Sequence, residues 1–353
     1  MNTTEALSPS DAIVYRVAQL FIGDGGKRPS TADIAEQVSR EFPKHERLTR
    51  EAIYPLVGVA VSRGFMKLVP PVDQQLAANL CARYPNLQQS TVRVVETAGA
   101  HDNAKVATVA AELAMEYTRE IARIKGGPVG LGLGPGRATL DFCVDYIRLL
   151  RGCTDPVKLK LVAISAGCPA EWPDYSSISF FNLFPKHRIE PRHGQVGLFA
   201  ETLVPQKDFE EIKKRPGVKE AFAARDSIDV VVTSMGDAND EDDLLSVFLK
   251  QSGKDLNRLR ASGWVGNVQY RPYTLHGPVE EKPNDLRAVT LFELADLARI
   301  ANQKHKHVVL IGRQCGQCQR TRAEALRPLL TEPTLKVFST LVLDAATAVD
   351  LLK

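Results

Sequence analysis

The glycine-rich segment Gly130–Thr139 has the residues needed to bind an anion. It follows a predicted strand and opens a predicted helix, where unpaired backbone N–H groups and the helix dipole attract negative charge. Gly134 and Gly136 would let the backbone turn tightly. Arg137 would add a positive charge and Thr139 a hydroxyl. The spacing matches neither the Walker pattern nor the Gly-x-Gly-x-x-Gly dinucleotide fingerprint, so a simple tight connection is the alternative.

Two further predicted strands are also followed by polar residues. Gly236 and Asp237 follow the run Ile228–Thr233, and Arg313 follows the run Val308–Gly312. Ligands of doubly wound sheets bind beyond the carboxyl ends of the strands. There the Asp237 carboxylate could accept hydrogen bonds from sugar hydroxyls, and arginines could hold a phosphate. Each of these residues alone also suits a solvated loop. The candidate effector site comprises Gly134, Gly136, Arg137, Thr139, Gly236, Asp237, Arg313, Gly316, Arg320 and Arg322.

The second group of candidate residues lies near the N-terminus and suits DNA. Between residues 40 and 67, six Arg or Lys stand against three Glu, which makes a modest basic patch. The helix expected there has an apolar stripe formed by Ile53, Leu56, Val57, Ala60 and Val61. If this helix enters the major groove, the side chains near its N-terminal end would reach the bases; these are Thr49, Arg50 and Tyr54. Phosphate contacts are expected from Lys44, His45, Arg47 and Arg63, although each alone also suits an ordinary surface charge.

Cys315 and Cys318 invite a metal or redox interpretation. One Cys-x-x-Cys supplies only two zinc ligands, and the other four cysteines form no matching pair, so an incidental pair is the alternative. We expect no metal and no cofactor. The acidic run Asp237–Asp243 is expected to form a solvated face or a helix start, because it lacks the spacing of a calcium loop.

Three helices are expected to carry the basic residues. The first spans residues 11–21, the second begins at Ser30 or Thr31 with a capping box, and the third ends at Gly64. Pro55 is expected to kink the third helix, because it removes a backbone hydrogen bond. Residues 65–68 are expected to form a short strand or wing, and the prolines that follow indicate a linker.

The rest of the chain alternates between strand and helix patterns. Strands are expected at residues 91–96, 129–133, 159–164, 228–233, 308–312 and 337–343, and helices at 74–84, 103–124 and 138–151. This alternation predicts an α/β protein whose larger part is a doubly wound, largely parallel sheet. The predicted domains are a (winged) helix-turn-helix at 1–70, a linker with a helix at 71–90, and an effector domain at 91–353.

Bulk properties set looser bounds. The net charge of +3 is too small to indicate nucleic-acid binding by itself. Hydrophobic residues make up 44% and charged residues 25%, which is typical of globular proteins. The polar N-terminus does not resemble a signal peptide, no apolar run is long enough to span a membrane, and the six cysteines follow no disulfide framework. We therefore expect a cytoplasmic protein with no membrane partner.

Taken together, these residues resemble the SorC/DeoR-type family of sugar-responsive transcriptional regulators. The resemblance rests on five segments in the family's order, namely Arg63–Leu68, Gly136-Arg137-x-Thr139, Val218–Ala221 with Ile228–Gly236, Gly263–Asn267 and Leu341–Leu352. It implies an effector domain similar in fold to ribose-5-phosphate isomerase and glucosamine-6-phosphate deaminase. It also implies a homodimer or homotetramer that binds a double-stranded DNA operator, and whose operator affinity changes when a sugar or sugar phosphate binds.

Two other functions remain open at this point. The same fold could serve a sugar-phosphate isomerase or deaminase with a helical N-terminal appendage, which would need a catalytic carboxylate and a base facing Gly130–Thr139. The N-terminal unit could instead contact protein and not DNA. We favour the regulator, and expect no enzymatic activity.

Overall fold

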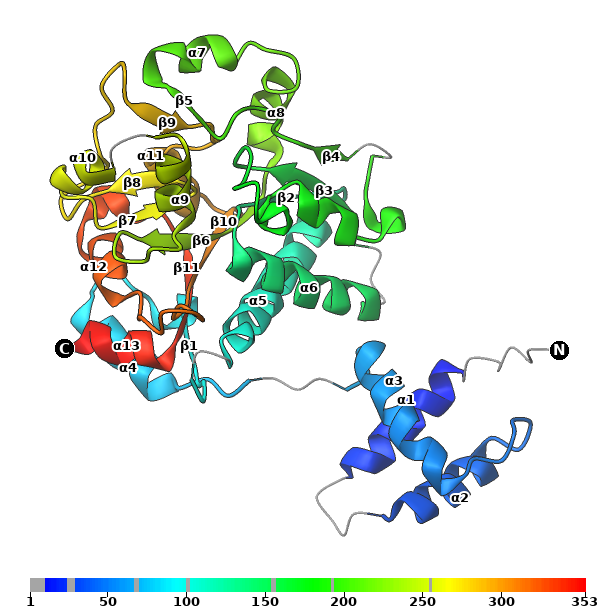
Figure 1. Cartoon of the computed structure of the whole chain (residues 1–353). Coiled ribbons are helices and arrows are strands. Elements are labelled where there is room, and N and C mark those ends of the chain that lie inside the picture. The colour runs from blue at the N-terminus through cyan, green and yellow to red at the C-terminus, as the bar shows by residue number, and fades with distance from the viewer. Residues whose placement is uncertain are drawn as a thin grey trace. The chain divides into compact units, whose positions relative to one another are not determined.

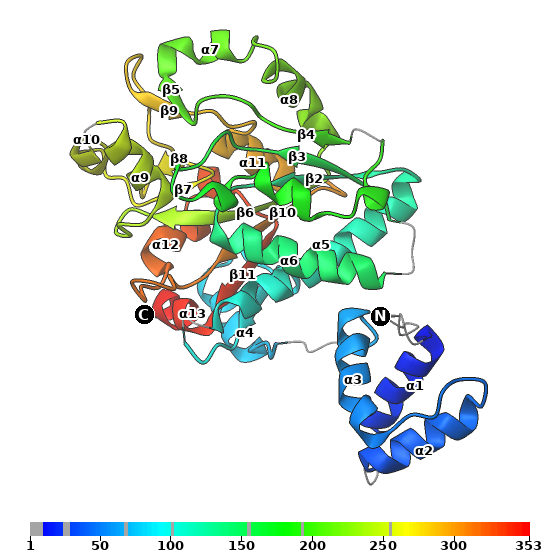
Figure 2. The same cartoon turned by 45° about the vertical axis from the view of Figure 1, so that its right-hand side comes forward.

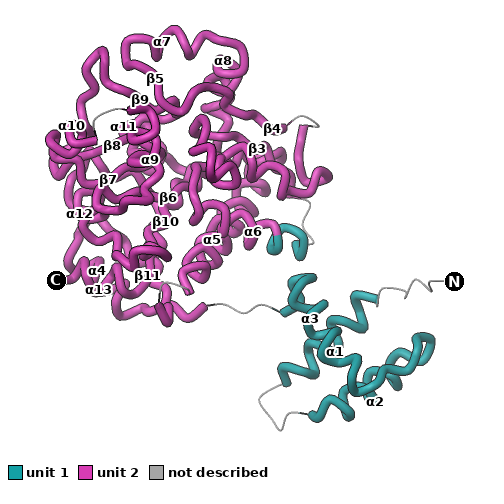
Figure 3. The backbone as a smooth tube through the Cα atoms, in the orientation of Figure 1, with its two compact units in different colours: residues 1–68, 148–154 teal, residues 69–147, 155–353 magenta. Residues whose placement is uncertain are grey.

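The computed structural model describes residues 10–23, 29–66, 70–99, 102–153, 157–191, 194–253 and 256–353. They fall into two compact units (Figure 3). The first comprises residues 1–68 and 148–154, and the second residues 69–147 and 155–353.

The first unit is built on α1 (Asp11–Ile22), α2 (Thr31–Glu41) and α3 (Ile53–Ser62) (Figure 1). The Ser30 side chain caps α2, and Ser30 and Asp33 form the expected capping box. Apolar residues at helical spacing meet in one core, which contains Ile13, Val14, Val17, Ile34, Val38, Ile53, Leu56 and Ala60. This burial orients the three helices, because each has only one apolar stripe.

Pro55 does not kink α3. The helix begins at Ile53, after a 3-10 turn at Arg50–Ala52, so Pro55 lies in its first turn. The first amides of a helix have no partner within it, and a proline there costs no hydrogen bond. Pro55 thus favours a late start of the helix, and the expected kink was wrong.

The segment directly after α3 caps the helix, and its described residues 64–66 form no strand. Gly64 has φ +78°, and its N–H donates to the carbonyl of Val61 at 3.1 Å. The N–H of Phe65 donates to the carbonyl of Ala60 at 2.8 Å, which completes a Schellman motif. The expectation of a wing strand was wrong at Phe65 and Met66, because their amides bond back to the helix; its other residues, 67 and 68, lie outside the described residues.

The second unit contains a parallel sheet, as the alternating pattern predicted. Its strands lie in the order β1 (Val92–Val95), β11 (Thr340–Asp344), β10 (His307–Gly312), β6 (Val230–Asp237), β2 (Val129–Leu133), β3 (Leu159–Ala163), β4 (Gln195–Val196). An antiparallel hairpin of β7 (Gly266–Val268) and β8 (Arg271–Tyr273) extends from the end of β6. A separate antiparallel pair joins β5 (Leu203–Pro205) to β9 (Leu286–Ala288).

Helices cover both faces of this sheet. Figure 2 shows α5 (Ala104–Lys125) beside α6 (Arg137–Gly152), and α5 packs on β1, β11, β10, β6 and β2. The helices that follow are α7 (Phe209–Ile212), α8 (Lys219–Ala224), α9 (Leu244–Gln251), α10 (Leu256–Ala261), α11 (Leu294–Ala301) and α12 (Ala323–Thr331). At the β1 edge, α4 (Gln74–Arg83) packs against α13 (Ala345–Leu352). Within the described residues, no helix combines the length and apolar character needed to cross a bilayer.

The strand order creates a switch point between β2 and β6. The chain leaves β2 through α6 towards β3 on one side, and leaves β6 towards β10 on the other side. Connections that diverge in this way leave a crevice at the carboxyl ends of the two central strands. The topology therefore fixes where a ligand site can form.

Candidate ligand pocket and DNA-binding surface

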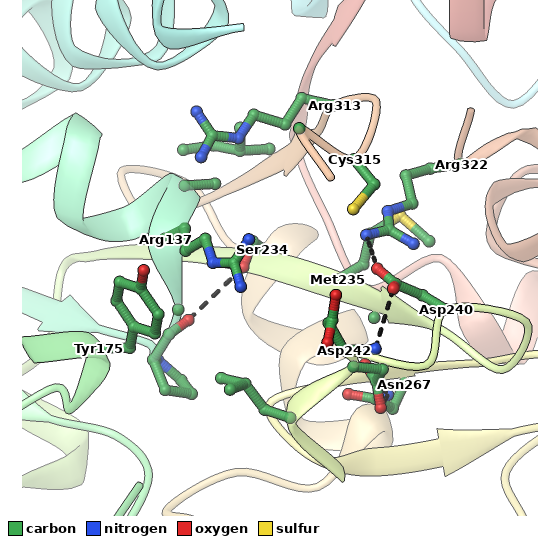
Figure 4. Close-up of a pocket in the computed structure, with 18 of the residues that line it drawn as sticks. Arg137, Tyr175, Ser234, Met235, Asp240, Asp242, Asn267, Arg313, Cys315 and Arg322 are labelled. Carbon is green, nitrogen blue, oxygen red and sulfur yellow. Dashed lines mark hydrogen bonds and ion pairs between the residues drawn. The ribbon is translucent and has the colours of Figure 1, made fainter. Parts of the chain in front are cut away.

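A cavity of about 120 Å³ opens at the carboxyl ends of β2, β6 and β10. Figure 4 shows Arg137 and Tyr175 on one side of it, and Asp240, Cys315 and Arg322 on the other. Ser234 and Met235 of β6 lie between the two sides. The cavity occupies the crevice that the switch point predicts.

One side of the cavity suits an anion. The first backbone hydrogen bond of α6 runs from the N–H of Leu140 to the carbonyl of Gly136 at 3.0 Å. The three preceding amides therefore have no partner within the helix. The Arg137 guanidinium lies 5.7 Å from the ring centroid of Trp172 and 5.3 Å from that of Tyr175, and donates to Gln317 Oε1 at 2.9 Å. Unpaired amides, the helix dipole and a guanidinium held by aromatic rings are features that attract anions, so this side is a candidate anion site.

The other two arginines of the pocket are already paired with carboxylates. Arg313 donates to Asp141 Oδ2 at 2.5 Å, and Arg322 donates to Asp240 Oδ2 at 2.5 Å. Among the described residues, no carboxylate pairs with Arg137. Arg137 is therefore the pocket arginine whose charge is available to a ligand.

The acidic run was expected to form a solvated face or a helix start; the solvated face was wrong for its buried members, and the helix start is confirmed at Asp243, the N-cap of α9. Asp237, Asp240 and Asp243 are 3%, 3% and 6% exposed. Each carboxylate has a partner: the N–H of Asn239 donates to Asp237, Arg322 pairs with Asp240, and Asp243 caps α9 by accepting from the N–H of Ser246 at 3.1 Å. These hydrogen bonds and the ion pair with Arg322 allow the three carboxylates to be buried, because buried carboxylates need donors.

Asp243 is held by a second donor from the hairpin. The Asn267 amide donates to Asp243 Oδ1 at 3.0 Å and to Oδ2 at 3.1 Å. Burial raises the pKa of Asp243 to about 6, despite the opposing hydrogen bonds from Asn267 and Ser246 and the charge of Arg322. The pKa of Asp240, by contrast, is lowered, because the charge and hydrogen bond of Arg322 outweigh the desolvation.

The turn between β7 and β8 contributes the most unusual part of the pocket wall. Gln269 and Tyr270 are its two central residues, with φ +54° and +64°, a left-handed conformation in which glycine or asparagine is usual. Both side chains are nearly fully buried. In the described part of the chain, neither the Nε2 nor the Oε1 of Gln269, nor the hydroxyl of Tyr270, has a hydrogen-bond partner. Strain and unpaired buried polar atoms at a cavity wall are typical of a binding site.

The structure brings together most, but not all, of the predicted effector-site residues. Six of them line the cavity, namely Gly136, Arg137, Gly236, Arg313, Gly316 and Arg322. Gly134 and Thr139 are buried beside it, and the Thr139 hydroxyl donates to the carbonyl of Pro135 at 3.4 Å. Asp237 and Arg320 line a different hollow with Asn239 and Glu324.

Several pocket residues were not predicted from the sequence. They are Tyr175, Asp240, Asp243, Asn267, Gln269 and Tyr270. Asp243 could have been predicted as a helix N-cap, because an aspartate directly before an apolar run is typical of that position. The turn at Gln269 and Tyr270 could not have been predicted, because a Gln-Tyr pair does not indicate a tight turn.

The first unit presents its basic residues to solvent. Lys44, His45, Arg47, Thr49 and Arg50 are exposed, and Tyr54 is 62% exposed on the face of α3 opposite Ile53, Leu56 and Ala60. Arg63 differs, because it is half-buried and its guanidinium pairs with Asp11 at 2.7 Å. The start of α3 therefore carries an exposed cationic and aromatic surface.

Solved structures of bacterial regulators share this fold. No protein-family model matches the chain, and no curated protein matches its sequence. The full-length sorbitol operon regulator SorC from Klebsiella pneumoniae is 15% identical, with a TM-score of 0.62 over 98% of this chain and 100% of that one. A DeoR family transcriptional regulator from Listeria monocytogenes is 17% identical, with a TM-score of 0.56 over 78% of this chain and 98% of that one.

A third match is to a single domain and covers part of this chain. The putative sugar-binding domain of a transcriptional repressor from Vibrio fischeri is 14% identical, with a TM-score of 0.53 over 79% of this chain and 98% of that one. The predicted fold class is thereby confirmed, including the N-terminal helical unit that the match over 98% of the chain covers. The chain has the fold of the SorC/DeoR-type transcriptional regulators.

Proposed function

We propose that this chain is a DNA-binding transcriptional regulator whose second unit senses a sugar phosphate or polyol phosphate. One observation supports this most: the same cavity is lined by Arg137, which has no carboxylate partner among the described residues, and by Gln269, whose amide has no hydrogen-bond partner among them. A phosphate would bind at the α6 N-terminus and Arg137. Hydroxyl groups would satisfy the amide, which can donate and accept at once.

The fold supports the same reading. The related structures are named a sorbitol operon regulator and a sugar-binding domain of a transcriptional repressor. Both names combine transcription control with a hydroxylated ligand. We propose the same two properties, transcription control and binding of a hydroxylated ligand, for this chain. Its own pocket has a candidate anion side and a wall of neutral and acidic polar groups.

A ligand screen tests the sensing part. Thermal shifts of the full chain would be recorded with pentose, hexose and polyol phosphates, and with the same compounds lacking phosphate. We expect a phosphorylated compound to raise the melting temperature, and Arg137→Ala to lose most of that shift. Arg83→Ala, an exposed arginine of α4, is the matched control. Equal shifts in the parent and in Arg137→Ala would exclude the proposed phosphate site.

The DNA-binding part rests on the exposed start of α3. Helix α3 would enter the major groove, with Thr49, Arg50 and Tyr54 near bases, and Lys44, His45 and Arg47 on phosphates. Arg63, whose Nη1 pairs with Asp11, is proposed as a further phosphate contact.

A double variant tests this surface. Lys44→Ala with Arg50→Ala should abolish binding to duplex DNA at low salt, measured by fluorescence anisotropy. Arg83→Ala with Lys304→Ala removes the same charge from exposed sites of the second unit and should bind like the parent. If both double variants lose the same affinity, only net charge matters and the α3 surface is not the site.

The enzyme alternative has less support from the pocket. Two of its carboxylates are committed, Asp240 to Arg322 and Asp243 to Asn267 and the start of α9. We therefore propose a sensor without turnover, and isomerase and deaminase assays on the compounds that bind would test this. We also propose a homodimer or homotetramer, since paired half-sites need paired helices; light scattering would report the oligomeric state.

A further inference from the structure

The proposed function leaves Cys315 and Cys318 without a role. They lie in the loop after β10, in the turn Cys315-Gly-Gln-Cys318, where the N–H of Gln319 donates to the carbonyl of Cys315 at 3.1 Å. Side chains three residues apart in such a turn lie on the same face. The two sulfur atoms and a carboxylate oxygen of Asp240 all lie within 4.8 Å of one another.

The two thiols differ in access. Cys315 is 7% exposed and lines the ligand cavity, whereas Cys318 is exposed. An accessible thiol that can meet an oxidant, next to a buried thiol that can resolve the product, is the arrangement that thiol–disulfide exchange requires.

Both thiols also contact the wall of the pocket. The Cys318 Sγ donates to Asp240 Oδ1 at 3.9 Å, and the Cys315 Sγ lies within 4.8 Å of an Asp240 carboxylate oxygen. Burial raises the pKa of Cys318, so the thiol is mostly protonated and its attack as a thiolate is expected to speed up as the pH rises. The same carboxylate pairs with Arg322 at 2.5 Å, and Asp240, Cys315 and Arg322 all line the cavity. A change at the thiols therefore changes the hydrogen bonding of a carboxylate that lines the pocket.

We propose that Cys315 and Cys318 form a reversible disulfide that weakens anion binding in the pocket. The Cys318 sulfur attacks a small-molecule disulfide such as oxidised glutathione and releases one glutathione thiolate. The Cys315 sulfur then attacks Cys318 and releases the second. The protein thiols lose two electrons and two protons, and the protons go to the released thiolates. Asp240 then loses the S–H donor of Cys318, so its charge opposes a bound anion more strongly.

Zinc is the competing occupant of this cluster, and the structure disfavours it. Asp240, Cys315 and Cys318 offer three ligand atoms. The Asp240 carboxylate is already paired with the nearly buried Arg322 guanidinium, which would lie next to the metal cation. A disulfide leaves that ion pair in place.

Peptide mass tests the covalent step directly. Cleavage after Arg313 and Arg320 gives the peptide Gln314–Arg320, which carries both cysteines and no other. After exposure of the reduced full chain to oxidised glutathione and then to an alkylating agent, this peptide should be unalkylated and lighter by two hydrogens. Dithiothreitol should restore two alkylation sites. Cys318→Ser should form no internal disulfide, and Cys81→Ser, a cysteine of α4, should behave like the parent.

Three results would overturn the proposed disulfide. After oxidation, the peptide could be alkylated at both cysteines, or could carry glutathione without an internal cross-link. Without oxidant, the peptide could be protected from alkylation by Zn²⁺. The regulatory step rests on the proposed function and is measured separately, as the thermal shift given by inorganic phosphate. We expect affinity to fall about tenfold on oxidation, which corresponds to about 1.4 kcal/mol, and not to fall in Cys318→Ser. Equal affinities would overturn the regulation. If phosphate binds neither form, the proposed anion site fails, while the peptide mass still decides the disulfide.

Discussion

The Asn267 amide bridges both carboxylate oxygens of Asp243, at 3.0 and 3.1 Å, and so ties the hairpin after β6 to the start of α9. Asn267 belongs to β7, whose pairing with β6 sets its position. One buried contact thereby joins two elements of the pocket wall. Its strength depends on the protonation of a carboxyl group whose pKa burial raises to about 6.

We predict that Asp243→Asn stabilises the second unit increasingly as the pH rises. A raised folded-state pKa means that the parent keeps its full stability below the ordinary pKa and loses stability as the pH rises through about 6. Asparagine keeps a cap for α9 and has no charge to bury. The gain in unfolding free energy should be small near pH 4 and reach up to about 3 kcal/mol at pH 7.

Urea unfolding followed by tryptophan fluorescence measures this. Both tryptophans, Trp172 and Trp264, lie in the second unit, so the signal reports that unit. Asp242→Asn, a neighbouring carboxylate that is not fully buried, is the control. A stability difference that does not change with pH would show that Asp243 is not the titrating group.

We predict that Gln269→Met stabilises the empty protein and weakens ligand binding. Methionine has nearly the same shape and removes two buried polar atoms that have no partner among the described residues; burying such atoms costs about 1–3 kcal/mol. The same tryptophan signal should show a higher unfolding free energy, and any sugar phosphate that binds the parent should give a smaller thermal shift. Gln251→Met, at an exposed glutamine, should change neither. Destabilisation by Gln269→Met would indicate that the amide has a partner in the folded protein.

We predict that Gly236→Ala disrupts the bridge between Asn267 and Asp243. A Cβ at Gly236 would lie 1.8 Å from Asp243 Oδ1 and 2.4 Å from Asn267 Nδ2, so both side chains must move. Overpacking of this kind costs about 1–3 kcal/mol. Gly127→Ala adds the same group where nothing lies within 4 Å and should be nearly neutral. Similar unfolding free energies for the two variants would contradict the packing described for this site.

We predict that Ser30→Ala loosens α2 in the first unit. The Ser30 hydroxyl accepts from the N–H of Asp33, and the Asp33 carboxylate accepts from the N–H of Ser30 at 2.9 Å. Loss of such a cap costs about 1 kcal/mol. Hydrogen exchange of the full chain should therefore speed up in α2, and Ser62→Ala at the exposed end of α3 should leave α2 unchanged. Unchanged exchange in Ser30→Ala would mean that packing alone holds the helix end.

The sequence by itself predicted six strands of the parallel sheet and the helices α4, α5 and α6, and it placed a candidate anion side of the pocket at the start of α6. Short, continuous apolar runs predicted the strands, because a parallel strand buried on both faces needs apolar residues on both. Strand β2 lies at Val129–Leu133 as predicted. The glycine-rich turn predicted the anion side at Arg137, because the chemistry of a helix N-terminus is local. The capping box at Ser30 was equally readable, since it depends on residues three apart.

Only the tertiary structure decided the rest of the pocket. Whether an aspartate faces water or the interior depends on donors that come from distant segments, as Asn267 does for Asp243. The Gln269–Tyr270 turn is held in a left-handed conformation by the strands around it, against the local preference of both residues. The proximity of the Cys315–Cys318 turn to Asp240 likewise follows from the pairing of β10 with β6, which brings the ends of two strands together.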